Sequence, residues 1–98
     1  MLRKGTLHVR DPDAASDGTY LAVTMINRPP HGVMVWAGRL HADAKDKPGA
    51  QIEQGDYASV EKVSFSVWSD VWEYFAGRHY APLLTSLRSE VEVLYPGE

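Results

Sequence analysis

Six of the ten aromatic residues of this chain lie in one segment of sixteen positions, Phe65-Ser-Val-Trp-Ser-Asp-Val-Trp-Glu-Tyr-Phe-Ala-Gly-Arg-His-Tyr80. The spacing i, i+3, i+4, i+7, which is typical of one face of a helix, is met by Trp68, Val71, Trp72 and Phe75. The pattern predicts a helix over residues 67–76 whose aromatic face packs on a sheet. As a large-to-small change in a core, Trp72→Ala is then expected to cost about 3–5 kcal/mol.

The apolar surface of this helix is wider than one small core usually needs. Val67 and Tyr74 extend the apolar arc on one side and Ala76 on the other, to roughly 200° of the helical wheel. Only three residues form a polar strip, namely Ser69, Asp70 and Glu73. The surplus on one edge of the helix indicates a partner.

Gly77 is expected to end the helix, because glycine readily adopts the left-handed conformation found after helix ends. The residues that follow it, Arg78 and Tyr80, are of types that anchor interfaces, and they flank a titratable histidine. We expect the chain to turn them outward. The partner-binding residues predicted from the sequence are Tyr74, Arg78, His79 and Tyr80. A purely structural role is the alternative, in which His79 interacts with the helix dipole.

The remainder of the chain is richer in strand patterns. Alternating or β-branched runs predict strands at residues 6–10, 19–27, 33–41 and 58–65. Residues 42–56 are polar, contain Pro48, Gly49 and Gly55, and are expected to form an exposed loop. Pro82 is suited to the first turn of a second helix, which would run through Leu87. Residues 90–95 alternate as a strand does, with a continued helix as the competing interpretation.

Strands followed by helices predict an α+β fold in a single small domain, residues 1–98. We expect a mainly antiparallel sheet of about four to five strands with one or two helices on one face. The other face needs polar residues. His8, Arg10, Thr24 and Lys62 are available for it, and Tyr20 and Trp36 would make it partly apolar.

The composition excludes several classes of site. The chain has no cysteine, which excludes disulfides, thiolate zinc sites and cysteine nucleophiles and favours a reducing, cytoplasmic location. The longest apolar run, residues 33–37, is far too short to span a membrane. The net charge is −3, with seven basic and five acidic residues in 1–49 and three basic and eight acidic residues in 50–98. This asymmetry favours a partner with a basic surface, whereas direct binding of nucleic acid is not expected.

Candidate chemistry is sparse. Asp11, Asp13 and Asp17 precede Gly18, but their spacing does not match a calcium loop, so an ordinary Asx-type turn is expected. His41 and Asp43 could act as a base with its orienting carboxylate on an extended segment. No nucleophile elbow, phosphate-binding glycine loop or zinc-protease motif occurs. We expect no metal and no cofactor.

These observations favour a non-enzymatic protein-binding module, of the kind represented by inhibitors, immunity proteins and antitoxins, which occludes another protein. One alternative is a small enzyme or ligand-binding domain that uses His41 and Asp43. The other is a self-associating structural subunit, in which the surplus apolar surface closes a homodimer.

Overall fold

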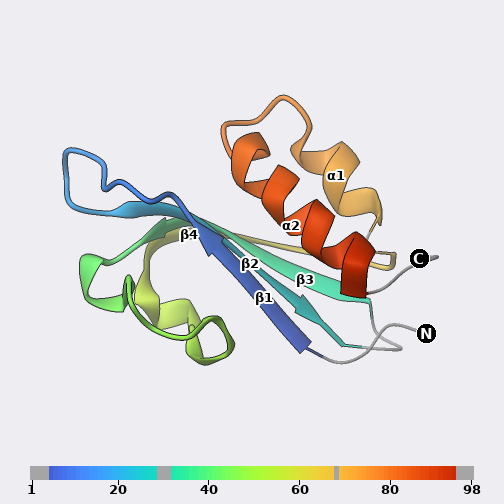
Figure 1. Ribbon diagram of the computed structural model, residues 1–98, viewed down its shortest axis with the longest axis horizontal. Coiled ribbons are helices and arrows are strands. Elements are labelled where there is room, and N and C mark those ends of the chain that lie inside the picture. Colours follow the sequence, from blue (N-terminus) through green and yellow to red (C-terminus); the bar gives the residue numbers. More distant parts are fainter. Residues whose placement is uncertain (1–4, 29–31, 68, 95–98) are drawn as a thin grey trace.

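The computed structural model describes the backbone of residues 5–28, 32–67 and 69–94, and the side chains of these residues as far as residue 91. The described residues form one antiparallel sheet in the order β1-β2-β3-β4 (Figure 1). Its strands are β1 (Gly5–Arg10), β2 (Tyr20–Asn27), β3 (Val33–Leu40) and β4 (Tyr57–Phe65). Each strand pairs with the next in the chain, so the sheet is a simple meander.

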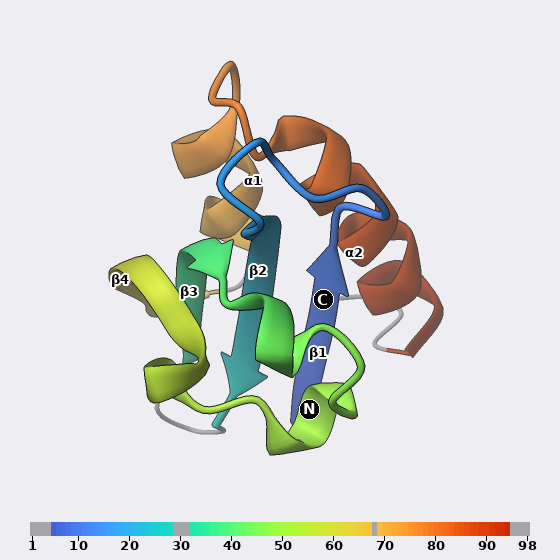
Figure 2. The ribbon, with the colours of Figure 1, turned by 90° about the vertical axis from the view of Figure 1, so that its left-hand side faces the viewer.

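Two helices of the described chain, α1 (Ser69–Phe75) and α2 (Ala81–Leu94), cover one face of this sheet (Figure 2). The α+β class with the helices on one face is therefore confirmed. The strand period of two directs Leu21, Val23 and Met25 of β2 toward the helices. The core on this side is made by Val23, Met25, Val33, Val35, Ala37, Val71, Phe75, Tyr80, Leu83, Leu84, Leu87 and Val91.

The aromatic helix is present but shorter than the sequence pattern predicts. It begins at Ser69 and ends at Phe75, and Trp68 lies outside the described residues. Val71 and Phe75 are completely buried against the sheet, as expected for the predicted core face. Gly77 has φ +79°, so the prediction that it ends the helix in the left-handed conformation is confirmed.

The prediction of a strand at residues 90–95 is wrong, because α2 continues to Leu94. Tyr95 lies outside the described residues. The buried side chains of α2 recur with helical spacing and make one continuous stripe, formed by Leu83, Leu84, Leu87 and Val91. The alternation of Glu and Val in residues 90–93 is compatible with either a strand or a helix. Packing of the apolar stripe on the sheet favours the helix.

The prediction of an exposed loop at residues 42–56 is right for most of its residues, but Ala44 and Ile52 are buried. The connection from β3 to β4, hereafter the loop 41–56, contains the short 3-10 turns η1 (Ala42–Ala44), η2 (Gly49–Gln51) and η3 (Gln54–Asp56). It folds back over the sheet face opposite the helices (Figure 2). Its apolar side chains Ala44 and Ile52 are buried in a second cluster with Ala22, Leu40 and Tyr57. Two isolated apolar residues therefore hold the loop against the sheet, although they produce no periodicity in the sequence.

Candidate partner-binding surface

Helix α1 divides its side chains between the core and the surface. Val71 and Phe75 point down to the sheet and are fully buried. Val67, just before the helix, is 53% exposed and Tyr74 is 42% exposed, and these are the exposed large apolar residues among those that the structure describes. The surplus edge of the predicted arc is therefore at the surface.

Tyr74 and Arg78 are brought together by an acidic residue of β4. The Tyr74 hydroxyl donates a 2.7 Å hydrogen bond to Oε2 of Glu61, and the Arg78 guanidinium lies 3.2 Å from Oε1 of the same carboxylate. The guanidinium carbon of Arg78 also lies 5.1 Å from the centre of the Tyr74 ring, within the range of a cation–π contact. An aromatic ring and a cation are thus held in a fixed arrangement at the surface. The sequence pattern does not reveal the part of Glu61, because strand and helix meet only in the tertiary structure.

The other two predicted site residues behave differently from each other. His79 is exposed, and its ring lies 4.3 Å from that of Tyr80. Tyr80 is only 8% exposed, so the expectation that the chain turns it outward is wrong. After Gly77 the chain folds back into α2, and the Tyr80 ring packs edge-on against Phe75 at 6.0 Å. Burial accordingly raises the pKa of the Tyr80 phenol.

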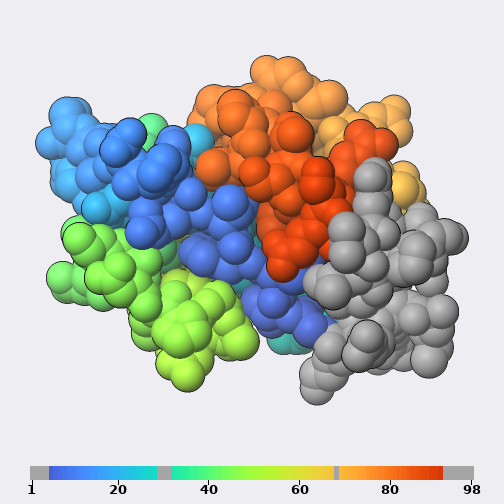
Figure 3. Space-filling model, in the orientation of Figure 1, coloured from blue at the N-terminus to red at the C-terminus, as the bar shows by residue number. Residues whose placement is uncertain are grey.

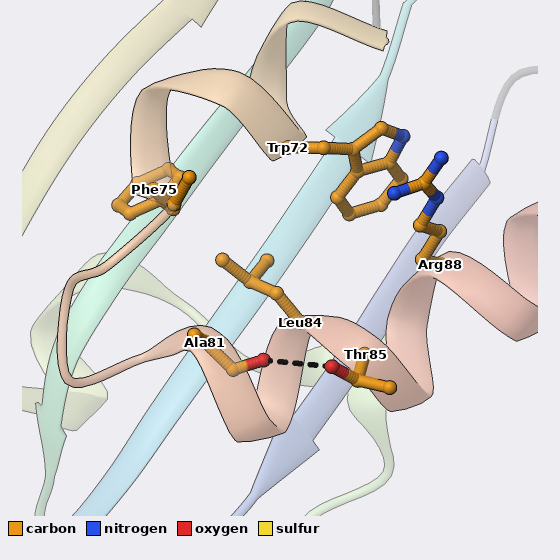
Figure 4. Close-up of a pocket in the computed structure, with 7 residues that line it drawn as sticks. Trp72, Phe75, Ala81, Leu84, Thr85 and Arg88 are labelled. Atoms are coloured by element: carbon orange, nitrogen blue, oxygen red, sulfur yellow. Dashed lines mark hydrogen bonds between the residues drawn. The ribbon is translucent and has the colours of Figure 1, made fainter.

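A groove of about 130 Å³ runs between α1 and α2 (Figure 4). Trp72, expected to be a core residue, is only half-buried and reaches from α1 toward Arg88 on α2, whose guanidinium lies 5.8 Å from the indole ring. The Thr85 hydroxyl donates to the carbonyl of Ala81 and so faces its own helix. The lining is completed by Phe75, Ala76, Ala81 and Leu84.

The sequence reasoning missed this groove. A signal for one wall existed, since Trp72 and Ala76 are one helical turn apart. The other wall, with Leu84 and Thr85, lies within the helix predicted through Leu87, but the groove itself could not be found because it depends on how the two helices pack side by side.

The solvent side of α1 is acidic. Asp70 and Glu73 are exposed, and among the described residues no ion pair or side-chain hydrogen bond involves them. Glu61 and Arg78 neutralise each other nearby. The upper surface of α1 therefore has a negative charge next to exposed aromatic area.

The remaining candidates from the sequence are not assembled into a site. His41 and Asp43 are both exposed, and the described residues include no hydrogen bond or ion pair between them. Oδ1 of Asp17 accepts 3.0 Å and 2.6 Å hydrogen bonds from the backbone and hydroxyl of Thr19, so it closes an Asx-type turn, and these bonds lower the pKa of its carboxyl. In the described parts of the chain, no three metal-binding side chains cluster and no helix is long and apolar enough to cross a membrane.

No protein-family model matches the chain, and neither the curated proteins nor the solved structures include a significant match to it. A function has to be inferred from the surface of the molecule itself.

Proposed function

We propose that this protein is a non-enzymatic binding module that covers a functional surface of another protein, as inhibitors, immunity proteins and antitoxins do, and that it acts in the cytoplasm. Its binding surface is the exposed side of α1, with Val67, Tyr74, Arg78 and His79, together with the adjoining groove between the helices. The observation that supports this proposal most directly is the exposure of Val67 and Tyr74, to which a groove walled by Trp72 adds on the side of α1 that faces α2.

The residue types on this surface are those that contribute most to protein interfaces. Tyrosine, tryptophan and arginine are enriched among residues whose removal costs most binding energy. Here Tyr74 and Arg78 are both held by Glu61, at 2.7 Å and 3.2 Å. Side chains that are already ordered lose less conformational entropy when a partner binds. The arrangement therefore favours recognition of a macromolecular surface.

The charge of the surface indicates the chemistry of the partner. Asp70 and Glu73 face solvent on α1, and residues 50–98 as a whole carry three basic and eight acidic side chains. Carboxylates at the rim of an interface accelerate association with a basic surface and make the rate depend on salt. We therefore expect a partner that presents lysine or arginine around an apolar contact.

Affinity capture with matched variants tests this function. The wild type, Tyr74→Ala, Arg78→Ala and the distant control Lys45→Ala are immobilised and exposed to lysate of the source cells, and any captured protein is then purified and titrated. Loss of a central anchor should weaken binding about tenfold or more for the Tyr74 and Arg78 variants, whereas the control should bind as the wild type does. If all four proteins bind equally, the surface is wrong. If concentrated samples are instead dimeric by sizing and Tyr74→Ala makes them monomeric, the surface serves self-association.

A further inference from the structure

Three side chains on the loop-covered face of the sheet form a chain of hydrogen bonds. Nδ1 of His8 on β1 lies 2.8 Å from the hydroxyl oxygen of Thr24 on β2, and that oxygen lies 2.7 Å from the hydroxyl of Tyr57 on β4. Thr24 is completely buried, Tyr57 is almost so, and His8 is half-buried. These two hydrogen bonds therefore connect β1, β2 and β4 beneath the loop 41–56.

The direction of these hydrogen bonds follows from the number of protons available. A threonine hydroxyl has one proton, so it can donate to only one of its two neighbours. If Thr24 donates to Nδ1 of His8, it accepts from Tyr57 and all three groups are satisfied. If His8 donates instead, one hydroxyl proton is left over: Thr24 either accepts from both neighbours, so that its own proton has no acceptor, or donates to Tyr57, so that the Tyr57 proton has none. Among the described residues, neither hydroxyl makes a further hydrogen bond. The neutral imidazole with its proton on Nε2 is therefore the form that fits.

The groups around His8 do not favour its positive charge. Arg10 on the same strand carries a like charge and donates from Nε to the carbonyl of Lys45 at 2.9 Å. The loop presents Gly49, placed so closely that a Cβ atom there would lie 2.9 Å from Cβ of His8. On the loop itself, the charges of Lys47 and Asp56 are paired with each other at 2.8 Å. Among the described residues, no carboxylate is within ion-pair distance of His8.

We propose that His8 is a pH-sensitive latch, which keeps the loop 41–56 docked on the sheet only while its imidazole is neutral. Protonation puts a proton on Nδ1, reverses the hydrogen bond to Thr24 and leaves the proton of one buried hydroxyl, that of Thr24 or that of Tyr57, without an acceptor. The same step places a second positive charge beside Arg10, under the loop. Both effects are relieved when the loop lifts and admits water to His8 and Tyr57.

The pH range follows from the direction in which the pKa of His8 is displaced. Burial, with a smaller contribution from Arg10, lowers the pKa of His8 below its ordinary value of 6.5. The docked form therefore binds its proton less readily than the open form. Docking is at full strength above about pH 6.5, weakens as the pH falls below this value, and weakens no further below the lowered pKa of the docked form. Between these two pH limits, the equilibrium constant for docking falls by a factor equal to the ratio of the proton-binding constants of the open and docked forms.

Nuclear magnetic resonance of the labelled wild-type chain tests both parts of the proposal. At about pH 7.5, nitrogen shifts of His8 should show the proton on Nε2, and a nuclear Overhauser effect should connect His8 with Gly49. On acidification, the Gly49 signal should change and this contact should weaken with the same midpoint as the His8 ring. A proton on Nδ1 at neutral pH would overturn the proposal, as would a Gly49 signal that ignores the titration of His8.

Two variants test whether protonation of His8 controls docking of the loop or whether His8 is merely buried beneath it. His8→Gln retains an acceptor for Thr24 and cannot be protonated, so the loop should stay docked down to about pH 5. Thr24→Val removes the hydroxyl at nearly constant volume and should move the His8 midpoint upward, toward that of a free imidazole. An acid transition that persists in His8→Gln, or an unchanged midpoint in Thr24→Val, would show that His8 does not control the loop. Should one variant fail to fold, the other and the wild-type tautomer still decide the question.

Discussion

The two faces of the sheet are covered in different ways. On one face α1 and α2 bury a continuous apolar cluster, in which Val71, Phe75 and Leu87 are almost completely inaccessible. On the other, the irregular loop 41–56 contributes only Ala44 and Ile52 to a smaller cluster that surrounds buried hydroxyl groups (Figure 3 shows α2 and this loop on either side of β1). The helical face owes its stability mainly to buried apolar area. The loop face depends also on hydrogen bonds and on the protonation of one histidine.

The largest effect is expected at the centre of the helical face. Phe75→Ala removes a fully buried ring in contact with Tyr80, and should lower the free energy of unfolding by about 3–5 kcal/mol. Urea denaturation followed by circular dichroism measures it. A loss below about 1 kcal/mol would mean that the helical face is not the main core.

A pH-dependent loss is expected on the loop face. Burial raises the pKa of the Tyr57 phenol to about 12, so the folded protein resists its ionisation. The stability from this effect is complete below about pH 10 and is lost as the pH rises through 12, a change of at most about 2–3 kcal/mol. Urea unfolding at about pH 9 and pH 12 should show this loss in the wild type and less of it in Tyr57→Phe. Tyr20→Phe is the matched control, at a tyrosine that is only half-buried. If both variants lose as much as the wild type, Tyr57 is not the cause.

Removal of an anchor of the loop should cost less than removal of a helical core residue. Ile52→Ala should lower the free energy of unfolding by about 2 kcal/mol, at the low end for such changes, since an irregular loop can collapse around the gap. The same denaturation assay applies, with exposed Asp46→Ala as control. A cost equal to that of Phe75→Ala would remove the distinction between the faces.

Trp72 distinguishes the core of the helical face from its surface. Because Trp72 is half-buried and lines the groove, Trp72→Ala should lower the free energy of unfolding by only about 1–2 kcal/mol, which is less than the value expected for a core tryptophan. Partner binding should suffer as well, if the groove belongs to the interface. A stability loss as large as that of Phe75→Ala would show that Trp72 acts as a core residue.

The smallest effect on folding is expected at the surface cluster. Glu61→Gln removes the negative charge shared by Tyr74 and Arg78, and exposed ion pairs contribute little to stability. The melting temperature should hardly change, whereas affinity for a partner should fall because the two anchors are no longer held. A drop of several degrees in melting temperature would show that the cluster is part of the fold.

Several elements could be predicted from the sequence because their signals are local. The alternation in residues 19–27, the aromatic spacing of Val71 and Phe75, and the glycine at position 77 correspond directly to β2, α1 and the end of α1. The exposure of Tyr74 also followed from the width of the apolar arc. A strand or helix period is contained in a few consecutive residues, so it can be recognised without knowledge of the rest of the chain.

Other features were decided only when distant segments met. Residues 90–94 became helix because Leu87 and Val91 extend a buried stripe, and Tyr80 became core because the chain folds back onto Phe75. The docking of the loop 41–56 depends on single apolar residues, and the His8–Thr24–Tyr57 chain joins positions 16 and 33 apart in sequence. Neither leaves a period in the sequence. Burial and hydrogen bonding between such residues are properties of the assembled sheet, and so the tertiary structure alone determined them.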